Sequence, residues 1–395
     1  MEGEPLSYEI GPLATAESKV PGSSGRPGIS ILDRTIQSRW NIAGYVDVEA
    51  DVNDKLMFST AARYEQYSDF GGNLSGKIAA LWKLTEAIAL RSSINRGFRA
   101  PSLQQVFNGQ TTSNAQNGLI RQTRQLASND PRLDAIGIPQ PAPELSWNYN
   151  MGFTFNLGRK LVFTADGYQI NVANRIIISE VLPVGPAIPI LQTVFPPSTG
   201  IREIAFFTNH INTSTRGLDL VLSYKQEFKT SGKLLVSAAL AMTSTVITSE
   251  KNPPKQLVSD ASVPVRLIDT ISIGLITTAQ PRQKIIGNLE YTYAKLLLNL
   301  RVTRFGAVTA WEKPAGIPHR GQTFRAKTLM DLLIGYKLLN RLQLTVGVNN
   351  LFNVYPDKVN TTYASYTNGQ VPYSRSGLQF GFNGSYYFTS VQIRL

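Results

Sequence analysis

The stretch Leu145–Leu157, LSWNYNMGFTFNL, alternates strictly between two kinds of side chain over thirteen residues. Odd positions carry Leu, Trp, Tyr, Met and Phe, and even positions carry Ser, Asn, Gly and Thr. Successive side chains of a β-strand point to opposite faces, so the pattern predicts a strand with one apolar and one polar face. Soluble strands usually have about 5 or 6 residues, whereas crossing a bilayer takes about 9–11. We therefore expect lipid on the apolar face and a wet lumen on the polar face.

Composition is compatible with this interpretation. The chain has 395 residues and no cysteine, so neither disulfides nor thiolate metal sites are available. A mean hydropathy of −0.10 resembles that of a soluble protein, but apolar and polar residues that alternate in a membrane barrel also cancel in an average. No window approaches the roughly 18 uninterrupted apolar residues of a membrane-spanning helix, and the N-terminus lacks the pattern of a signal peptide.

The formal charge of +12 bears on possible partners. A nucleic-acid-binding protein concentrates Lys and Arg on one helix or patch. Here these residues are scattered over predicted strands and turns, which disfavours nucleic acid. Attraction to anionic lipid headgroups, or a positively charged lumen, explains the charge better.

Similar alternation along the chain predicts about fourteen strands. We expect them at 7–11, 40–52, 55–67, 74–84, 87–98, 145–157, 161–172, 211–228, 233–248, 284–293, 296–308, 324–338, 341–349 and 386–395.

The connections between these strands alternate in length. Tight turns are expected near 53, 85, 158, 230, 294 and 339, and the longest loops at 99–144, 173–210, 249–281 and 350–385. Short turns on one rim and long loops on the other are typical of outer-membrane barrels. The predicted fold class is therefore all-β, a transmembrane antiparallel up-and-down β-barrel. An elongated soluble β-protein is the alternative, but its strands would be shorter and its turns less regular.

Three stretches resemble segments of the TonB-dependent outer-membrane receptor family. They are NRGFRAPSL at Asn95–Leu103, VNNLFNVYPD at Val348–Asp357, and RYEQYSDFG at Arg63–Gly71. The resemblance covers nearly the whole chain. It implies a barrel of 22 strands with a plug inside, of which residues 1–395 would supply the C-terminal part of the barrel domain. The plug and the TonB box have no counterpart here, so we expect a partial barrel.

The resemblance also implies a function and partners. The family's role is uptake of a scarce solute such as a ferric siderophore, a vitamin or an oligosaccharide across the cell outer membrane. Expected partners are outer-membrane lipid and lipopolysaccharide, a small-molecule or chelate ligand at the extracellular loops, and the TonB–ExbB–ExbD complex. A self-contained porin, or an outer-membrane enzyme active at its rim, remains open as an alternative.

The residues of the three stretches also have structural interpretations. Pro101 should stop the strand before it, because proline cannot donate to a sheet ladder. Asn350 suits a turn, Leu351 and Phe352 should anchor the following loop, and Tyr64 and Tyr355 suit an aromatic girdle. None of these roles requires ligand contact. The full set of family-like residues is Arg63, Tyr64, Asp69, Gly97, Phe98, Arg99, Pro101, Asn350, Leu351, Phe352 and Tyr355.

No catalytic, metal or cofactor site is expected. The two histidines, His210 and His319, lie in polar or loop-like contexts and suit a solvated rim, and no hydrolase, zinc or phosphate-loop motif occurs. Basic residues expected to face the lumen are a better functional candidate, because a lumen of one sign of charge attracts anionic solutes. Pairing with Asp47, Glu49, Asp51, Glu65 or Asp166 is the favoured alternative. These basic candidates are Lys77, Lys83, Arg91 and Arg301.

Overall fold

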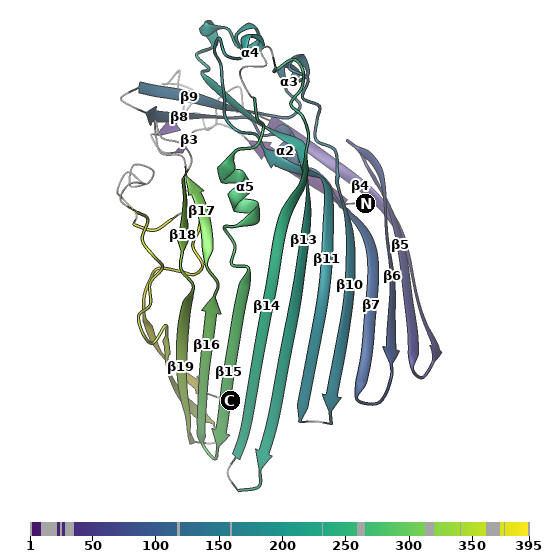
Figure 1. Cartoon of the computed structure of the whole chain (residues 1–395), viewed down its shortest axis with the longest axis vertical. Helices are drawn as coiled ribbons and strands as arrows, with labels where there is room; N and C mark the ends of the chain where they lie inside the picture. The colour runs from purple at the N-terminus through teal and green to yellow at the C-terminus, as the bar shows by residue number, and fades with distance from the viewer. Residues whose placement is uncertain are drawn as a thin grey trace.

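Fourteen antiparallel strands form one continuous curved wall (Figure 1). The computed structural model describes residues 2–8, 22–23, 26–27, 35–116, 119–158, 160–230, 232–258, 265–312, 320–339, 341–360, 372–374 and 376–393. The wall strands are β1 (Glu2–Tyr8), β4 (Thr35–Asn53), β5 (Leu56–Tyr67), β6 (Gly71–Lys83), β7 (Ile88–Arg99), β10 (Glu144–Leu157), β11 (Leu161–Ile178), β13 (Glu203–Phe228), β14 (Gly232–Glu250), β15 (Gln283–Tyr293), β16 (Leu296–Phe305), β19 (Lys327–Leu339), β20 (Leu342–Asn349) and β21 (Tyr386–Ile393).

Each wall strand pairs with the next wall strand along the chain, which is an up-and-down order. Within the described ranges no pairing joins β21 to β1, and the wall is not closed. The all-β barrel-type fold and the number of strands are thus as predicted. The residues beyond Tyr8 in the first predicted strand, and Arg394 and Leu395 in the last, lie outside the described residues.

The connections separate the two rims of the wall. Six tight turns, after β4, β6, β10, β13, β15 and β19, lie together at the lower end in Figure 1 and define the short-turn rim. The long connections rise at the opposite end, the loop rim. Gly158 has a φ of 57° in the turn after β10, a left-handed conformation that glycine adopts without steric cost. The predicted alternation of turns and loops is found, apart from the three-residue connection 68–70 between β5 and β6 on the loop rim.

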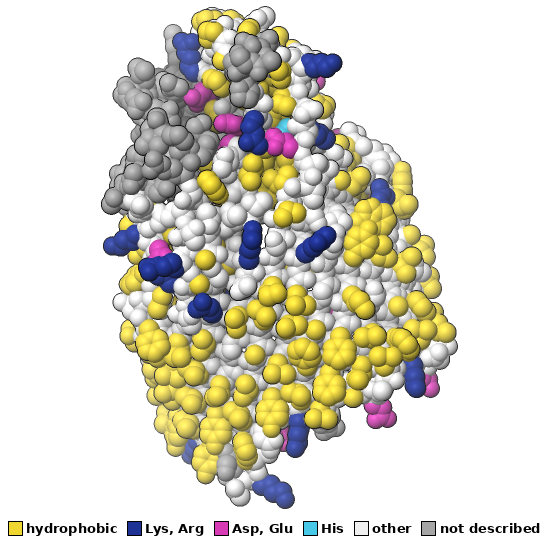
Figure 2. Space-filling view, viewed as in Figure 1, with side chains coloured by type: hydrophobic (Ala, Val, Ile, Leu, Met, Phe, Trp, Pro, Cys, Tyr) yellow, Lys and Arg dark blue, Asp and Glu magenta, His cyan; other side chains and the backbone are white. Residues whose placement is uncertain are grey.

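The register assigns every wall residue to one of two faces, because directly paired residues share a face. In β10 the odd positions form the apolar row and the even positions the polar row. The apolar face stays exposed along the wall: Met151 of β10 is 67% exposed, Ile78 of β6 59% and Val46 of β4 66%. Figure 2 shows hydrophobic side chains gathered as an apolar belt over the lower part of the wall. A folded protein exposes such a continuous belt only where something other than water covers it.

Above the loop rim, three of the long connections fold together into a cap. It contains α2 (Leu103–Phe107), β8 (Gln110–Gln116), β9 (Leu119–Leu126), α3 (Pro131–Ala135), β12 (Leu182–Pro183), α4 (Pro189–Val194), the 3-10 helix η2 (Pro197–Thr199) and α5 (Thr270–Thr277). Shorter hairpins, β2 (Gly22–Ser23) with β3 (Arg26–Pro27) and β17 (Val308–Glu312) with β18 (Arg320–Phe324), lie on the same side.

The cap has a hydrophobic core of its own, which the loop prediction missed. Thirteen buried side chains from three separate connections pack together, and Leu126, Leu191, Ile204, Phe206 and Leu257 are 0% exposed. The strands also extend farther than predicted: β11 continues to Ile178 and β13 begins at Glu203, so both ends of the predicted loop 173–210 are strand. The apolar residues of these connections are spaced irregularly, so no single periodicity marks them, and their order comes from contacts between distant loops. No helix in the described part is long and apolar enough to cross a membrane.

Candidate functional site

The polar face of the wall holds an ion pair between β7 and β11. Arg91 of β7 donates from Nε to Asp166 of β11 at 2.8 Å, and a second bond joins Nη2 to Oδ2 at 2.5 Å. The same guanidinium donates to Thr154 at 2.7 Å. The pair crosses β10 directly over Gly152, where a Cβ atom would stand 2.1 Å from Asp166 Oδ1. Glycine is therefore required at this position by the ion pair above it.

The remaining lumen candidates share this polar face, although not all are paired. Register connects Lys77 with Asn95, Lys83 with Ala89, and Arg301 with Asp331. In the described residues, Lys77, Lys83 and Arg301 have no carboxylate oxygen within 4.0 Å, unlike Arg91. Among the described residues, the polar face thus combines the bonded ion pair of Arg91 with cations that make no direct contact with a carboxylate.

Three further polar contacts stand at the loop rim, one in each family-like stretch. Arg99, the last residue of β7, donates through Nε to Glu144 Oε2 at 2.9 Å and through Nη2 to Oε1. Glu144 is the first residue of β10 and also accepts a bond from the Ile176 backbone N–H at 2.7 Å. This carboxylate joins the start of the connection 100–143 to its end and to β11. The bond to Glu144 holds the pKa of Arg99 above its ordinary range.

The second contact closes the RYEQYSDFG hairpin. Arg39 of β4 is 3% exposed and donates to Asp69 through Nε at 3.0 Å and through Nη2 at 2.6 Å. Its guanidinium lies 5.8 Å from the Tyr67 ring and 5.3 Å from the Phe70 ring, which stack on each other. Cation–π contact and a bidentate carboxylate together bury this charge. Arg63, the first residue of the stretch, pairs with Glu65.

The third contact is centred on Asn350, which is 5% exposed and has a left-handed φ of 55°. Its side chain donates to the Val354 carbonyl and accepts from the Val354 N–H, each at 2.8 Å. Its own N–H donates to Asp331 at 2.8 Å, and its carbonyl accepts from the Ser385 hydroxyl at 2.7 Å. The predicted turn role of Asn350 is supported by this geometry, since Asn tolerates the left-handed region better than other side chains.

The expectation that Phe352 anchors this loop is wrong. Its ring is 66% exposed, and Leu351 is only half-buried. The hydrogen bonds of Asn350 fix the turn instead, so the following apolar side chains are free to point outward. Tyr355 is 40% exposed, and its hydroxyl would stand 2.3 Å from a Cβ at Gly384, which has a φ of 72°. It therefore packs beside the entry to β21 and is not part of a strand girdle.

The other motif residues shape the end of β7. Gly97 and Phe98 pair with the first residues of β10, at the loop-side end of β7. The strand ends at Arg99, two residues before Pro101. Ser102 then caps α2 by accepting from Gln105 N, with Gln105 reciprocating. Tyr64 stands on the apolar face opposite Gly44 and is 52% exposed. The structure thus gives these residues contacts within the wall.

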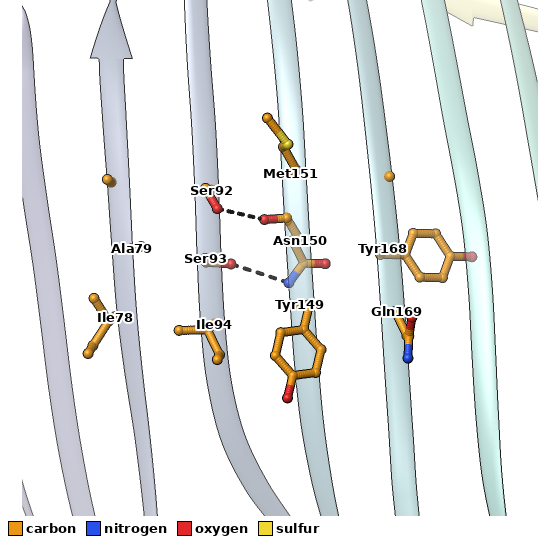
Figure 3. Close-up of a pocket in the computed structure, with 12 residues that line it drawn as sticks. Ile78, Ala79, Ser92, Ser93, Ile94, Tyr149, Asn150, Met151, Tyr168 and Gln169 are labelled. Carbon is orange, nitrogen blue, oxygen red and sulfur yellow. Dashed lines mark hydrogen bonds between the residues drawn. The ribbon is translucent and has the colours of Figure 1, made fainter. Parts of the chain in front are cut away.

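A depression of about 480 Å³ opens on the apolar face (Figure 3). Ile78, Ile94 and Tyr149 form one paired row, and the next row contains the small residues Ala80, Ser92 and Gly167 beside Met151. The missing side-chain volume of that second row creates the hollow. Ser92 itself donates to the Asn150 carbonyl at 3.2 Å. The depression is a gap in the apolar belt and holds no charged group, so it does not mark a site for a polar solute.

A larger hollow of about 580 Å³ lies at the base of the cap. The segments 137–142 and 251–256 flank it, and the loop-side end of β13 contributes its floor. This volume falls within the range of about 300–1,000 Å³ that small-molecule sites occupy. Its polar lining consists of Gln140, Asn174, Thr208, Asn209, His210, Lys251, Asn252 and Gln256.

His210 is not the solvated histidine that the sequence suggested. Its side chain is 2% exposed, and Nε2 lies 3.3 Å from Glu250, which also accepts from Arg266 at 3.1 Å. Burial lowers the pKa of His210 below its ordinary value of 6.5, with Glu250 opposing that shift. The imidazole is therefore neutral at pH 7. His319 lies outside the described residues.

The donor sets for metal binding are sparse. Within the ranges that the structure describes, no group of three or more His, Cys, Asp or Glu side chains could hold a metal ion.

Asp357 has two cationic neighbours: Arg325 donates at 3.0 Å and Lys327 at 2.7 Å. The bond from Arg325 keeps the pKa of Asp357 far below its ordinary range. Through these two ion pairs, Asp357 joins the loop after β20 to the start of β19.

A belted wall of fourteen long strands, with short turns on one rim and a folded cap on the other, defines the class of transmembrane β-barrel domains. The family model described as "TonB dependent receptor-like, beta-barrel" matches residues 11–351. The chain belongs to this family.

Solved structures of similar fold come from several bacteria. The siderophore receptor PirA of Acinetobacter baumannii has a TM-score of 0.63 and 15% identity, over 99% of this chain and 50% of that one. A ferric enterobactin receptor (PfeA) mutant of Pseudomonas aeruginosa has a TM-score of 0.62 and 17% identity, over 99% and 49%. The FrpB iron transporter of Neisseria meningitidis has a TM-score of 0.57 and 13% identity, over 91% and 46%. This chain thus spans about half the length of these proteins. No curated protein matches the chain.

Proposed function

We propose that this chain forms wall and cap of an outer-membrane receptor that takes up a scarce solute of the ferric siderophore class. The observation that carries the proposal is the family match over residues 11–351. The similar structures described as siderophore receptors point to the same solute class. Vitamins and oligosaccharides are the competing solutes. The family match favours a receptor over a diffusion channel. His210 is buried and lies 3.3 Å from Glu250, so it gives no support to an enzyme active at the rim.

The ligand would be captured at the base of the cap. There the hollow of about 580 Å³ presents amides and one lysine, Lys251, to a solute. Ferric chelates with carboxylate or catecholate oxygens offer hydrogen-bond acceptors and negative charge that such groups complement. Because the cap has its own hydrophobic core, this lining is organised before a ligand arrives, which reduces the entropic cost of binding.

The cations of the polar face that lack a bonded carboxylate among the described residues extend this preference along the wall. Lys77, Lys83 and Arg301 face the lumen side and would hold a positive potential for an anionic solute leaving the cap. As a family member the chain would work in the outer membrane with lipopolysaccharide around it. Its energy-coupling partner would be the TonB–ExbB–ExbD complex, which engages such receptors through segments other than this wall.

Binding of ferric chelates to the full-length natural protein tests the proposal. Intrinsic fluorescence titrations with a panel of ferric hydroxamates, catecholates and carboxylates should give saturable binding of at least one class. Lys251→Gln should weaken that binding several-fold, whereas Lys255→Gln, an exposed lysine of the same segment that does not line the hollow, should leave it unchanged. Saturable binding of a neutral oligosaccharide, with no response to any ferric chelate, would overturn the solute class.

A further inference from the structure

Three arginines stand on the outward, apolar face of the wall. Register assigns Arg96 to the row of Trp147, Arg216 to the row of Gln169 and Tyr149, and Arg304 to the row of Ile285. Each row belongs to the face that carries the apolar belt. Arginine is costly in contact with hydrocarbon, so three of them on this face need an explanation.

Each of the three arginines follows the apolar run in the outward-facing row of its own strand. From the short-turn rim upward, the outward row of β16 reads Leu296, Leu298, Leu300, Val302 and then Arg304. In β13 the outward residues Leu222, Leu220 and Leu218 precede Arg216, and in β7 Ile88, Leu90, Ser92 and Ile94 precede Arg96. Each arginine therefore follows the apolar run at its loop-side end. Figure 2 shows basic side chains along that margin of the belt.

Carboxylates of the same strands are on the opposite face. The acids in the paired strands, Asp47, Glu49, Asp51, Glu65, Asp166, Asp219, Glu290 and Asp331, all share rows with polar-face residues.

Among the described residues, the outward arginines bond neutral groups. Arg96 donates to the Leu74 carbonyl at 2.6 Å, Arg216 to Gln169 at 3.1 Å, and Arg304 to Thr328 at 3.4 Å. No described carboxylate lies within 4.0 Å of these three, whereas Arg63, Arg91 and Arg99 of neighbouring strand positions all have one. Their positive charge is thus available to a partner outside the wall.

Aromatic neighbours place this level of the wall at a membrane interface. Trp147 pairs directly with Arg96 and is 44% exposed, and Tyr149 is 42% exposed one row below. Trp and Tyr are enriched where headgroups meet hydrocarbon, and arginine binds phosphate through two parallel N–H groups. We propose that Arg96, Arg216 and Arg304 form a phosphate-binding girdle for anionic lipid of the leaflet on the loop side.

The girdle can be tested by lipid preference of the full-length natural protein. Tryptophan quenching by brominated phosphatidylglycerol and by brominated phosphatidylcholine measures how strongly anionic lipid is enriched around the wall. Replacing the three arginines by glutamine should reduce this enrichment by roughly fivefold per arginine at low salt. The charge-matched control, Lys77→Gln with Lys83→Gln and Arg301→Gln, removes three charges from the polar face and should retain the enrichment.

Lysine replacements at the three girdle positions keep the charge and should preserve most of the enrichment, which separates a charge effect from damage to the wall. Equal losses in the girdle variant and its control would show that only net charge matters and would overturn the proposal. So would an unchanged preference in the girdle variant. Inorganic phosphate that abolishes the enrichment, where chloride at equal ionic strength does not, would assign the arginines to a free anion and not to lipid.

Discussion

Arg99 and Glu144 face each other across the two ends of the connection 100–143, joined by a bidentate ion pair in which Nε and Oε2 are 2.9 Å apart. The sequence separation of 45 residues makes this contact the closure of the largest loop on the wall. Because Glu144 also accepts from the Ile176 N–H, the pair fixes β7, β10 and β11 at the level where the cap begins.

Glu144→Gln should release this closure. The amide keeps a possible bond to Ile176 but loses the charged bonds to Arg99, so we expect a loss of about 1–2 kcal/mol of stability. Hydrogen exchange at Ile176 and in the connection 100–143 would report the loss as faster opening. The exposed pair Lys225–Glu227 supplies a control: Glu227→Gln should change nothing measurable. Unaltered exchange at Ile176 in Glu144→Gln would contradict the role given to the pair.

Asn350→Ala should be among the most disruptive changes in the loop after β20. It removes two side-chain hydrogen bonds to Val354 and forces alanine into a φ of 55°. Together these effects should cost about 2–3 kcal/mol. Asn350→Gly keeps the backbone conformation while losing the bonds, so denaturant unfolding should rank it between the wild type and alanine. An alanine variant as stable as glycine would show that backbone strain plays no part.

Gly152→Ala should break the polar face locally. The new Cβ would meet Asp166 Oδ1 at 2.1 Å and Arg91 Nε at 2.6 Å, so the ion pair must move. We expect a loss of about 1–3 kcal/mol, as for other overpacked positions. Gly44, on the apolar face, has no atom within 4 Å of its built Cβ, and Gly44→Ala should be neutral or slightly stabilising. Thermal unfolding of the two variants compares them, and equal midpoints would refute the steric argument.

The cap should lose stability in mild acid through His210. Burial lowers the pKa of this histidine in the folded state below its ordinary 6.5, so the unfolded state binds the proton more readily. The stabilising contribution is therefore complete above about pH 6.5 and is lost as the pH falls through the lower, folded pKa. His210→Gln should flatten this dependence in hydrogen exchange of the cap, and His319→Gln should not. Identical profiles in both variants would exclude His210 as the cause.

Strand periodicity predicted the wall well because each side chain there faces one of two uniform surroundings. The alternation of Leu145–Leu157 and of 74–84 contains enough information to locate a strand and assign its faces. The family-like stretches were also found from the sequence, but their contacts were not. Nothing local indicates that Asp69 binds Arg39, or that Glu144 binds Arg99, since each pair joins residues 30 or more positions apart.

The cap was missed for a different physical reason. Its core combines Leu126, Leu191 and Leu257 from three separate connections, and no one of these segments has a periodic pattern long enough to predict an element. The exposed Phe352 and the buried His210 were assigned the wrong surroundings because composition was the only guide. Whether a loop residue is buried depends on which distant segments pack together, and the local sequence pattern does not specify those contacts.

The two faces of the wall can be measured directly, because the chain contains no cysteine. Single cysteines at successive positions of β10, from Asn150 to Asn156, can be spin-labelled in the membrane-embedded full-length protein. Accessibility to oxygen, which partitions into lipid, should peak at Met151, Phe153 and Phe155, and accessibility to a water-soluble nickel chelate at Asn150, Gly152, Thr154 and Asn156. A period of two in opposite phase for the two reagents is the predicted result. Uniform accessibility along the strand, or water access at Met151 and Phe153, would contradict a membrane wall.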